Sequence, residues 1–238
     1  MKIALVGYGT MNRLVANKIE NTPGIECVGA VDVGMYPNLD AIETDFDVII
    51  DFSYPGNLDM IEDYVRKTHK PVVIASTGFD DEQIERIHAL GNYAPVVFTG
   101  NFSLGICVFE QILKLITPIL KDTFDMEVIE KHHNKKIDAP SGTAKMLVNA
   151  LNYENDYEVI YGRSGMKKRG KEIGVNALRG GTIVGEHTVV FAGEDEILEI
   201  THEAHSKLIF VNGSIKAATF VVDKEYGVYD MNAVLFNN

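Results

Sequence analysis

The 238-residue sequence predicts an α/β protein: a doubly wound parallel sheet, joined to a second α+β domain with an open mixed sheet. Two observations carry this prediction. In the first hundred residues, short runs rich in Val and Ile alternate with helix-like segments, as in parallel sheets whose strands are buried on both faces. After Asn101, a long apolar helix and a β-hairpin replace that alternation. The change of pattern indicates a second sheet of a different kind.

The first region is expected to contain five strands and three helices. The strands are the runs at 2–7, 26–32, 47–52, 71–76 and 95–100. The helices are the segments at 11–21, 57–68 and 80–91. In the second of these helices, Leu58, Ile61 and Val65 fall on one face, which is the spacing of a helix that packs on a sheet. Regular alternation of this kind favours one parallel sheet covered by helices.

The second region is expected to hold a different set of elements. They are a helix at 105–121, a strand at 124–133, a helix at 141–152 and a hairpin over 182–204. Ser141 or Thr143 suits the N-cap of the second helix. The hairpin is expected to turn at 193–196. Its apolar residues are expected to cover one face, namely Val189, Phe191, Ile197, Leu198 and Ile200. A last helix at 208–222 returns the chain to the first region.

Composition and charge narrow the class of protein. The net charge of −12 argues against a nucleic-acid partner, because such proteins present a basic face. No stretch approaches the roughly 20 apolar residues of a membrane span, and Cys27 and Cys107 form no metal-like pair. We therefore expect a cytoplasmic protein without membrane association. Within 131–179, however, ten basic residues stand against five acidic ones, which favours a small anionic ligand. The basic run at 163–171, taken alone, fits a solvated loop.

The run "VGYGTMN" follows the first expected strand and opens the first expected helix. Gly7 and Gly9 stand where a dinucleotide fingerprint needs a tight turn and a close backbone approach, while Asn12 replaces the usual third glycine or alanine. Alone, the loop also fits a plain strand–turn–helix. Asp32, at the end of the second strand, can accept hydrogen bonds from a ribose. Together these features favour a Rossmann-like dinucleotide-binding domain. Its expected contacts are Gly7, Tyr8, Gly9, Thr10, Met11, Asn12 and Asp32.

The densest chemistry lies at 130–144, "EKHHNKKIDAPSGTA". Two histidines and three lysines fall within six residues there, and the Pro-Ser-Gly-Thr turn opens a helix whose N-terminal N–H groups could hold a carboxylate. The run resembles the signature E-x-H-H-x-x-K-x-D-A-P-S-G-T of the dihydrodipicolinate reductase family. The resemblance continues in "STGF" at 76–79, "GNFSLG" at 100–105, "RGGTIVGEH" at 179–187 and "ITHEA" at 200–204.

The resemblance implies an enzyme that reduces 4-hydroxy-2,3,4,5-tetrahydrodipicolinate to tetrahydrodipicolinate with NADH or NADPH, in the diaminopimelate route to lysine. The implied substrate is a small cyclic imine that carries two carboxylates. Family members are homotetramers built through the second domain. On this interpretation, residues 1–103 and 208–238 bind the dinucleotide, and residues 104–207 bind substrate and form the subunit interface.

The resemblance also implies roles for individual residues. His132 is expected to be the catalytic acid, and Lys136 to donate a proton or stabilise negative charge. The expected substrate-binding residues are His133, Ser141, Gly142 and Thr143. The loops after the fourth and fifth strands are expected to flank the nicotinamide, through Ala75, Ser76, Thr77, Thr99, Gly100, Asn101 and Phe102.

Coenzyme choice is expected to favour NADH weakly. Asp32 can accept hydrogen bonds from a ribose diol but repels a 2′-phosphate. No basic residue lies between Lys18 and Arg66, and Arg13 is the nearby cation that could reach a phosphate. We therefore expect the protein to use both coenzymes.

Other interpretations stay open on the residues alone. His132, His133 and Asp138 could hold a metal, but their spacing matches no zinc pattern, so no metal is expected. A nucleotide-sensing or scaffold protein could keep the fold without catalysis. A phosphorylating semialdehyde dehydrogenase would need a catalytic cysteine, and neither Cys27 nor Cys107 lies in a suitable motif.

Overall fold

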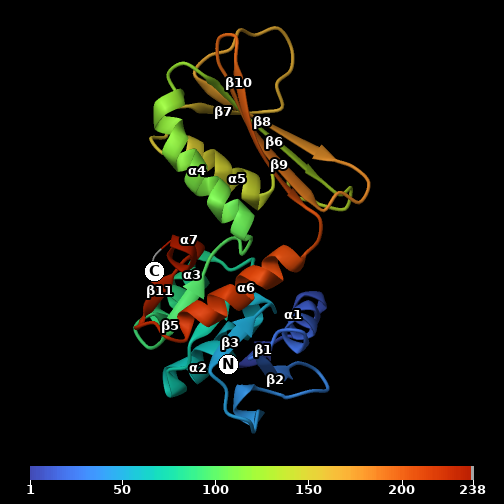
Figure 1. Cartoon of the computed structure of the whole chain (residues 1–238), viewed down its shortest axis with the longest axis vertical. Helices are drawn as coiled ribbons and strands as arrows, with labels where there is room; N and C mark the ends of the chain where they lie inside the picture. Colours follow the sequence, from blue (N-terminus) through green and yellow to red (C-terminus); the bar gives the residue numbers. More distant parts are fainter. Residues whose placement is uncertain (237–238) are drawn as a thin grey trace. The chain divides into compact units, whose positions relative to one another are not determined.

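The structure, a computed structural model, describes residues 1–236 and consists of two compact units (Figure 1). Unit 1 is formed by residues 1–104 together with residues 208–236. Unit 2 is formed by residues 105–207. The chain therefore leaves unit 1, builds unit 2, and returns to complete unit 1.

Unit 1 is built on a six-stranded parallel sheet. The strands are Lys2–Val6 (β1), Glu26–Val31 (β2), Val48–Asp51 (β3), Val72–Ile74 (β4), Pro95–Phe98 (β5) and Gly227–Tyr229 (β11). Their order across the sheet is β11-β5-β4-β3-β1-β2, and every ladder is parallel. The chain runs outward from β1 to β2 and then returns past it to β3, so the strand order reverses at β1. Ligands of such sheets bind at the carboxyl ends of the strands beside that reversal.

Helices cover both faces of this sheet. They are Thr10–Glu20 (α1), Leu58–Thr68 (α2), Asp81–Leu90 (α3), Leu208–Val221 (α6) and Met231–Phe236 (α7), with 3₁₀ turns at Leu39–Ala41 and Pro55–Asn57. Neighbouring residues of a strand point to opposite faces, and Ile49 and Ile50 are both fully buried. Ile49 packs in one core with α2 and α3, while α6 contacts the strands together with α1. The predicted doubly wound sheet is confirmed.

Unit 2 is built on a five-stranded mixed sheet. Its strands are Asp125–His132 (β6), Glu158–Tyr161 (β7), Glu172–Arg179 (β8), Gly185–Ala192 (β9) and Ile197–Ala204 (β10), and its helices are Leu104–Leu120 (α4) and Gly142–Leu151 (α5). The order is β10-β9-β6-β8-β7. The central strand β6 pairs in parallel with β8 and antiparallel with β9. The predicted open mixed sheet is therefore confirmed.

The two faces of this second sheet differ. Figure 1 shows α4 and α5 on the same side of the strands. Beneath them lie the apolar side chains of the core, Met126, Val128, Ile173, Val175, Val189 and Phe191. On the opposite face of β6, the alternate residues Glu127, Ile129 and Lys131 are only half-buried. The helices thus cover one face and leave the other open.

The hairpin prediction was partly wrong. Gly193 N–H donates to Glu196 O at 2.9 Å, which confirms the turn. Ile197 and Leu198, however, are 67% and 41% exposed instead of covered. Ile197 pairs with Ala192 on the open face, and both residues begin the edge strand β10, which has a neighbouring strand on one side only.

Candidate active site

The first candidate site lies in unit 1, where the strand order reverses. A cavity of about 520 Å³ is lined there by residues that follow β1, β2 and β3. Its volume falls within the range of small-molecule sites. Four of the expected coenzyme contacts line it, Gly7, Tyr8, Gly9 and Asp32. Residues that sequence analysis did not single out also line it, among them Tyr36, Ser53, Tyr54 and Asn57.

The glycine loop suits a pyrophosphate. Gly7 has φ +80°, and a Cβ on it would lie 2.8 Å from Ser53 Cβ, so glycine is required at this turn. Gly9 is the N-cap of α1, and no side chain caps this end of the helix. The first turn carries no acidic residue, and nothing lies within 4 Å of a Cβ built on Gly9. The N–H groups of the helix terminus are thus open to an anion.

Asn12 explains why the third fingerprint position need not be glycine here. The residue is fully buried. Its Nδ2 donates to Val6 O at 2.7 Å and to Gly7 O at 2.8 Å. Asn12 therefore ties α1 to the end of β1 from inside the protein and fixes the shape of the loop.

Asp32 and Arg13 both form hydrogen bonds with the backbone of Tyr8 but no ion pair with each other. Asp32 accepts a hydrogen bond from Tyr8 N through Oδ2 and another from Val33 N through Oδ1 at 2.6 Å. Arg13 Nε donates to Tyr8 O at 3.0 Å, and its guanidinium lies 5.7 Å from the centre of the Tyr8 ring. The carboxylate is thus held by neutral N–H groups.

Thr10 and Met11 lie in the first turn of α1 and do not line the cavity. The expected coenzyme contacts at 75–77 and 99–102 follow β4 and β5 in the same unit. Ala75 and Ser76 are buried, whereas Thr77 and Gly100 are exposed. Phe102 is buried, and its ring lies 6.3 Å from that of Phe52. The described structure places these residues at the carboxyl edge of the sheet but not in the lining of the 520 Å³ cavity.

One buried acid beside the carboxyl edge of this sheet was not predicted from the sequence. Asp51 ends β3 and is 1% exposed. Its Oδ1 accepts hydrogen bonds from Ser53 N at 2.9 Å and from Ser53 Oγ at 2.5 Å. Burial raises the pKa of Asp51, and the hydrogen bonds from Ser53 oppose this rise only in part.

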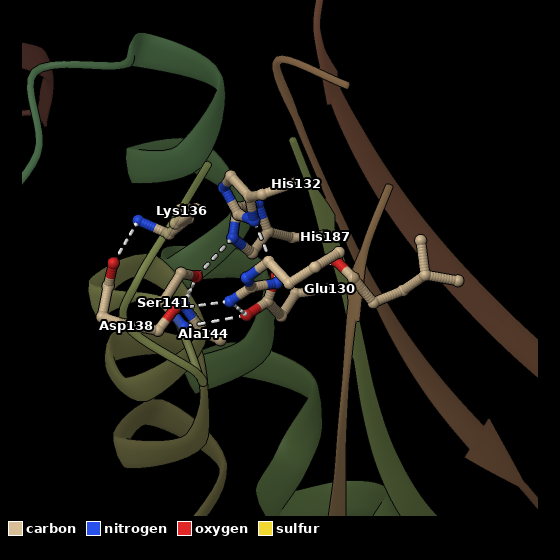
Figure 2. A network of polar contacts seen from close by, with 9 residues as sticks. Glu130, His132, Lys136, Asp138, Ser141, Ala144 and His187 are labelled. Carbon is tan, nitrogen blue, oxygen red and sulfur yellow. Dashed lines mark hydrogen bonds and ion pairs between the residues drawn. The ribbon is translucent and has the colours of Figure 1, made fainter. Parts of the chain in front are cut away.

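The second candidate site lies in unit 2, at the carboxyl end of β6 (Figure 2). Alternate residues of this strand face α4 and α5. Met126 and Val128 place apolar groups there, and Glu130 and His132 follow with titratable ones, all four buried. The covered face of one strand thus changes from apolar core to polar site.

Glu130 is the centre of the network in Figure 2. It is fully buried. Its Oε2 lies 2.6 Å from His132 Nδ1 and accepts from Arg179 Nη1 at 2.7 Å. Its Oε1 accepts from Ser141 N at 2.9 Å and from Arg179 Nη2 at 2.7 Å. Burial alone would raise the pKa of Glu130, but the hydrogen bonds from Arg179, His132 and Ser141 outweigh it and lower the pKa.

His187 stands beside His132 on the neighbouring strand β9. The two rings meet edge to face, with centroids 5.1 Å apart. His187 Nε2 lies 3.0 Å from Ser141 Oγ. Burial, followed by the charge of His132, lowers the pKa of His187 to about 4. His187 is therefore neutral at pH 7.

The N-terminus of α5 lies next to this pair. Of the two expected N-caps, Ser141 is the one in place, and its Oγ accepts from Ala144 N at 3.1 Å. Ser141 is buried, and both its hydroxyl and its N–H form hydrogen bonds inside the protein, with Ala144 N and with Glu130. Gly142 is exposed, and nothing lies within 4 Å of a Cβ built on it. Thr143 follows, half-buried.

Lys136 and His133 lie in the loop between β6 and α5. Lys136 Nζ contacts Asp138 Oδ1 at 2.9 Å, and this hydrogen bond lowers the pKa of Asp138. Arg179 Nη2 also donates to Asp138 O at 2.6 Å, which fastens the loop. His133 is half-buried.

The basic run at 163–171 is not a free charge cluster. Arg163 contacts the buried Glu172. Arg169 contacts Asp125 and Glu127, and Lys171 contacts Asp156. The simple solvated loop expected from the sequence is therefore a loop held by ion pairs.

Residues 1–236 contain neither a metal-ligating cluster nor a membrane-spanning helix. No group of three or more His, Cys, Asp or Glu side chains in this range is placed to hold a metal ion. None of the helices in this range combines the length and the apolar character of a membrane span.

Fold and sites together define a class of protein, a two-domain oxidoreductase that binds a nicotinamide coenzyme. Two family models match the chain: "Dihydrodipicolinate reductase, N-terminus" over residues 1–102 and "Dihydrodipicolinate reductase, C-terminus" over residues 105–235. The chain belongs to the dihydrodipicolinate reductase family, which confirms the resemblance noted in its signature.

Relatives named 4-hydroxy-tetrahydrodipicolinate reductase match it along nearly their whole length. One from Brachyspira hyodysenteriae is 41% identical, with 99% of this chain and 100% of the relative covered. One from Clostridium novyi is 38% identical, with 98% of each covered. Among solved structures, a dipicolinate-bound dihydrodipicolinate reductase from Paenisporosarcina sp. TG-14 shares the fold, with a TM-score of 0.78, 20% identity and 97% of each chain covered.

Proposed function

We propose that this chain reduces 4-hydroxy-2,3,4,5-tetrahydrodipicolinate to tetrahydrodipicolinate with NADH or NADPH, in the diaminopimelate route to lysine. One observation in the structure carries the proposal. A histidine held by a buried carboxylate lies beside the uncovered N-terminus of a helix, within one network of unit 2. A proton donor and an anion-binding helix end are what unit 2 would contribute to the reduction of a dicarboxylate imine.

The substrate is expected to bind through its carboxylates. One carboxylate takes the N-terminus of α5, where Gly142 leaves the backbone uncovered and Thr143 adds a hydroxyl. Lys136 and His133, in the preceding loop, supply a cation and a ring N–H for the remainder of the dianion. Ser141 acts from inside, because its own polar groups cap α5 and contact Glu130.

His132 is the proposed acid and Lys136 the proposed second catalytic group. Loss of water from the 4-hydroxy substrate leaves a conjugated imine, to which the reduced nicotinamide, when bound to unit 1, would supply a hydride. His132 donates the proton that completes the reduction. Lys136 stabilises negative charge, or donates a proton, as water leaves the ring. The loops with Ala75–Thr77 and Thr99–Phe102 are proposed to flank the nicotinamide.

We also propose a homotetramer assembled through unit 2. The face of its sheet away from α4 and α5 is open, and Leu178 on β8 and Ile197 on β10 are 49% and 67% exposed. Sheet-to-sheet packing between copies would cover such a face and protect the edge strand. Light scattering at micromolar concentration tests this, and a monomeric mass would refute it.

A coupled assay tests the activity. Fresh product of the preceding synthase is supplied as substrate, and NADH or NADPH absorbance is followed. His132→Gln should lower kcat by about 10²–10⁴-fold, the usual effect of losing a general acid. His205→Gln, on an exposed histidine of the same unit, is the matched control and should leave kcat unchanged. Wild-type protein that oxidises neither coenzyme with this substrate would refute the proposal.

A binding experiment tests the substrate site separately. Pyridine-2,6-dicarboxylate is a flat dianion and should compete with the substrate. Calorimetry should show weaker binding to Lys136→Ala and to Thr143→Val, because each variant loses a group that faces a carboxylate. Unchanged affinity in both variants would place the dianion elsewhere.

A further inference from the structure

We propose that Glu130 is a positioning residue that keeps the proton of neutral His132 on Nδ1, so that Nε2 is the nitrogen that exchanges a proton with the substrate. This inference rests on the proposed function in taking His132 as the acid. It adds which ring nitrogen of His132 transfers the proton and which residue fixes the tautomer.

The donors around Glu130 lead to this assignment. A guanidinium and a backbone amide can only donate hydrogen bonds. Arg179 donates to both carboxylate oxygens at 2.7 Å, and Ser141 N donates to Oε1 at 2.9 Å. A bidentate guanidinium and a backbone N–H favour the ionised carboxylate, which can only accept hydrogen bonds. Its last contact, at 2.6 Å to His132 Nδ1, therefore requires a proton on Nδ1.

Arg179 keeps that carboxylate ionised. Its fork spans both oxygens of Glu130, a geometry that a single amine cannot reproduce. The Arg179 side chain is 18% exposed and the Glu130 side chain 0%, so water screens the pair poorly. The lowered pKa of Glu130, where burial is outweighed by these hydrogen bonds, agrees with an ionised carboxylate at neutral pH.

The second ring nitrogen is left uncovered. Among residues 1–236, no group forms a hydrogen bond with His132 Nε2. The atom is also not among the fully buried polar atoms, so it is accessible from outside the protein interior. A Cβ built on Gly185 would lie 3.0 Å from Nε2. Glycine at position 185 thus leaves space beside the nitrogen from which a proton would be transferred.

The wild-type protein tests the inference without any variant. Nitrogen-15 NMR of labelled histidines distinguishes a protonated ring nitrogen from a bare one. The His132 signals are identified by their loss in His132→Gln. At a pH where the ring is neutral, we expect the proton on Nδ1 and a bare Nε2. A neutral His132 ring with the proton on Nε2 would overturn the inference.

Glu130→Gln is the decisive variant. It replaces one acceptor oxygen by an NH₂ group, and a bare His132 Nδ1 is the acceptor that this group can use. We expect the proton of neutral His132 to move to Nε2 and kcat to fall by about 10²–10⁴-fold, as when a carboxylate that orients a catalytic histidine becomes an amide. Affinity for NADH, measured by fluorescence, should stay within about twofold and reports that unit 1 is folded.

Two further variants separate positioning from general damage. Glu127 lies on the same strand and is also held by an arginine, Arg169, but it contacts neither His132 nor α5. Glu127→Gln should therefore change neither the tautomer nor kcat. Arg179→Lys keeps a positive charge but loses the fork, so we expect the Nδ1 proton to remain and kcat to fall less than in Glu130→Gln. A folded Glu130→Gln protein with an unchanged tautomer and unchanged kcat would overturn the proposal.

The NMR readout does not depend on turnover. If the wild-type protein failed to reduce the substrate while neutral His132 carried its proton on Nδ1, the proposed function would fail and the tautomer assignment would stand. If the assay succeeded while the proton lay on Nε2, the proposed function would stand and the role of Glu130 would fail.

Discussion

Asp51 in unit 1 and Glu130 in unit 2 are equally buried carboxylates, with 1% and 0% of each residue exposed. Asp51 accepts hydrogen bonds from the amide and hydroxyl of Ser53, which are neutral groups. Glu130 accepts from a guanidinium and contacts an imidazole. Burial raises the pKa of Asp51, whereas for Glu130 hydrogen bonds reverse that effect and lower the pKa. The partners, and not the depth of burial, decide in which direction the pKa of each carboxylate moves.

Removing the cation from the charged site should have the largest effect. Arg179→Met leaves Glu130 buried without its counter-ion, and breaking a buried pair in this way costs about 3–5 kcal/mol of unfolding free energy. Urea denaturation followed by circular dichroism measures the loss. Lys67→Met is the control, because it removes a pair whose side chains are 67% and 56% exposed, worth about 1 kcal/mol or less. Equal losses in the two variants would show that Glu130 becomes protonated instead of staying charged.

His187 extends the comparison to a buried base. Its pKa is lowered to about 4 by burial and by the charge of His132, so the folded protein favours the neutral ring. The stability linked to His187 is fully present above the unfolded pKa of about 6.5 and is lost as pH falls through about 4. The difference between these pKa values corresponds to about 3 kcal/mol. The free energy of unfolding should therefore fall between pH 7 and pH 4.

Two variants isolate this effect. His187→Gln removes the titrating ring, so its loss of stability between pH 7 and pH 4 should be smaller than in the wild type. His205→Gln removes an exposed histidine and should follow the wild-type curve. Identical curves for His187→Gln and the wild type would assign the acid sensitivity to other groups.

Sequence patterns predicted the elements whose residues are apolar at a regular spacing. The five strands β1 to β5 and the helices between them follow that rule. Strand β8 does not, because Gly174 interrupts it. A Cβ on Gly174 would lie 1.9 Å from Glu127 Oε2, so this glycine makes room for a charged neighbour across the sheet. The strand β11 has three residues and offers no period to detect.

The site was predicted in part for a related reason. The signature named His132 and Ser141, which lie near each other in the chain as well as in the fold. Glu130 belongs to the same signature and the same strand as His132, whereas Arg179 on β8 and His187 on β9 complete the network from neighbouring strands. In the sheet, His132 pairs with Arg179 across β8, and Glu130 pairs with His187 across β9. One sequence does not specify strand register, so these partners could not be paired from it. The catalytic and binding roles of the individual residues stay predictions.

Asp51 is the buried carboxylate whose partners are neutral, and replacing it should have a smaller effect. The raised pKa of Asp51 means that its contribution to stability is fully present below the unfolded pKa of about 3.9 and is lost as pH rises through the folded pKa. Asp51→Asn keeps an oxygen for Ser53 and removes the group whose ionisation burial opposes. We expect it to gain about 1 kcal/mol of unfolding free energy at pH 7, within the usual range for single substitutions.

The pH dependence gives the control for Asp51. The gain in Asp51→Asn should shrink toward zero below about pH 4, where Asp51 is protonated in both states. Glu130→Gln should show the opposite sign at pH 7, because it removes a carboxylate whose charge is fully paired. Destabilisation by Asp51→Asn at pH 7 would mean that the charged carboxylate, despite its burial, is the form that the protein needs.

Asp32 is a third carboxylate, and the same comparison predicts coenzyme choice. Its two partners are the N–H groups of Tyr8 and Val33, which hold the carboxylate without neutralising it. The charge therefore acts on whatever the adjoining cavity holds. It can accept hydrogen bonds from a ribose diol but repels a 2′-phosphate by about 1 kcal/mol in water-like surroundings, and by more where partly buried. A repulsion of about 1–1.4 kcal/mol corresponds to a preference for NADH of roughly five- to tenfold in kcat/KM.

Arg13 sets the limit of this preference. The Arg13 guanidinium lies over the Tyr8 ring, and its Nε donates to Tyr8 O. Tyr8 N in turn donates to Asp32. Arg13 itself forms no ion pair with the Asp32 carboxylate. It is thus a cation close enough to the cavity to moderate the repulsion, and NADPH should remain a coenzyme. Asp32→Ala should bring the two kcat/KM values together, and Arg13→Ala should widen the gap by weakening NADPH use alone. Asp40→Ala, which removes an acid that pairs with Lys67 outside the cavity lining, should leave the ratio unchanged. If the wild-type protein prefers NADPH, the attraction of Arg13 for the 2′-phosphate is stronger than the repulsion by Asp32. A carboxylate held only by neutral donors would then not determine the coenzyme preference.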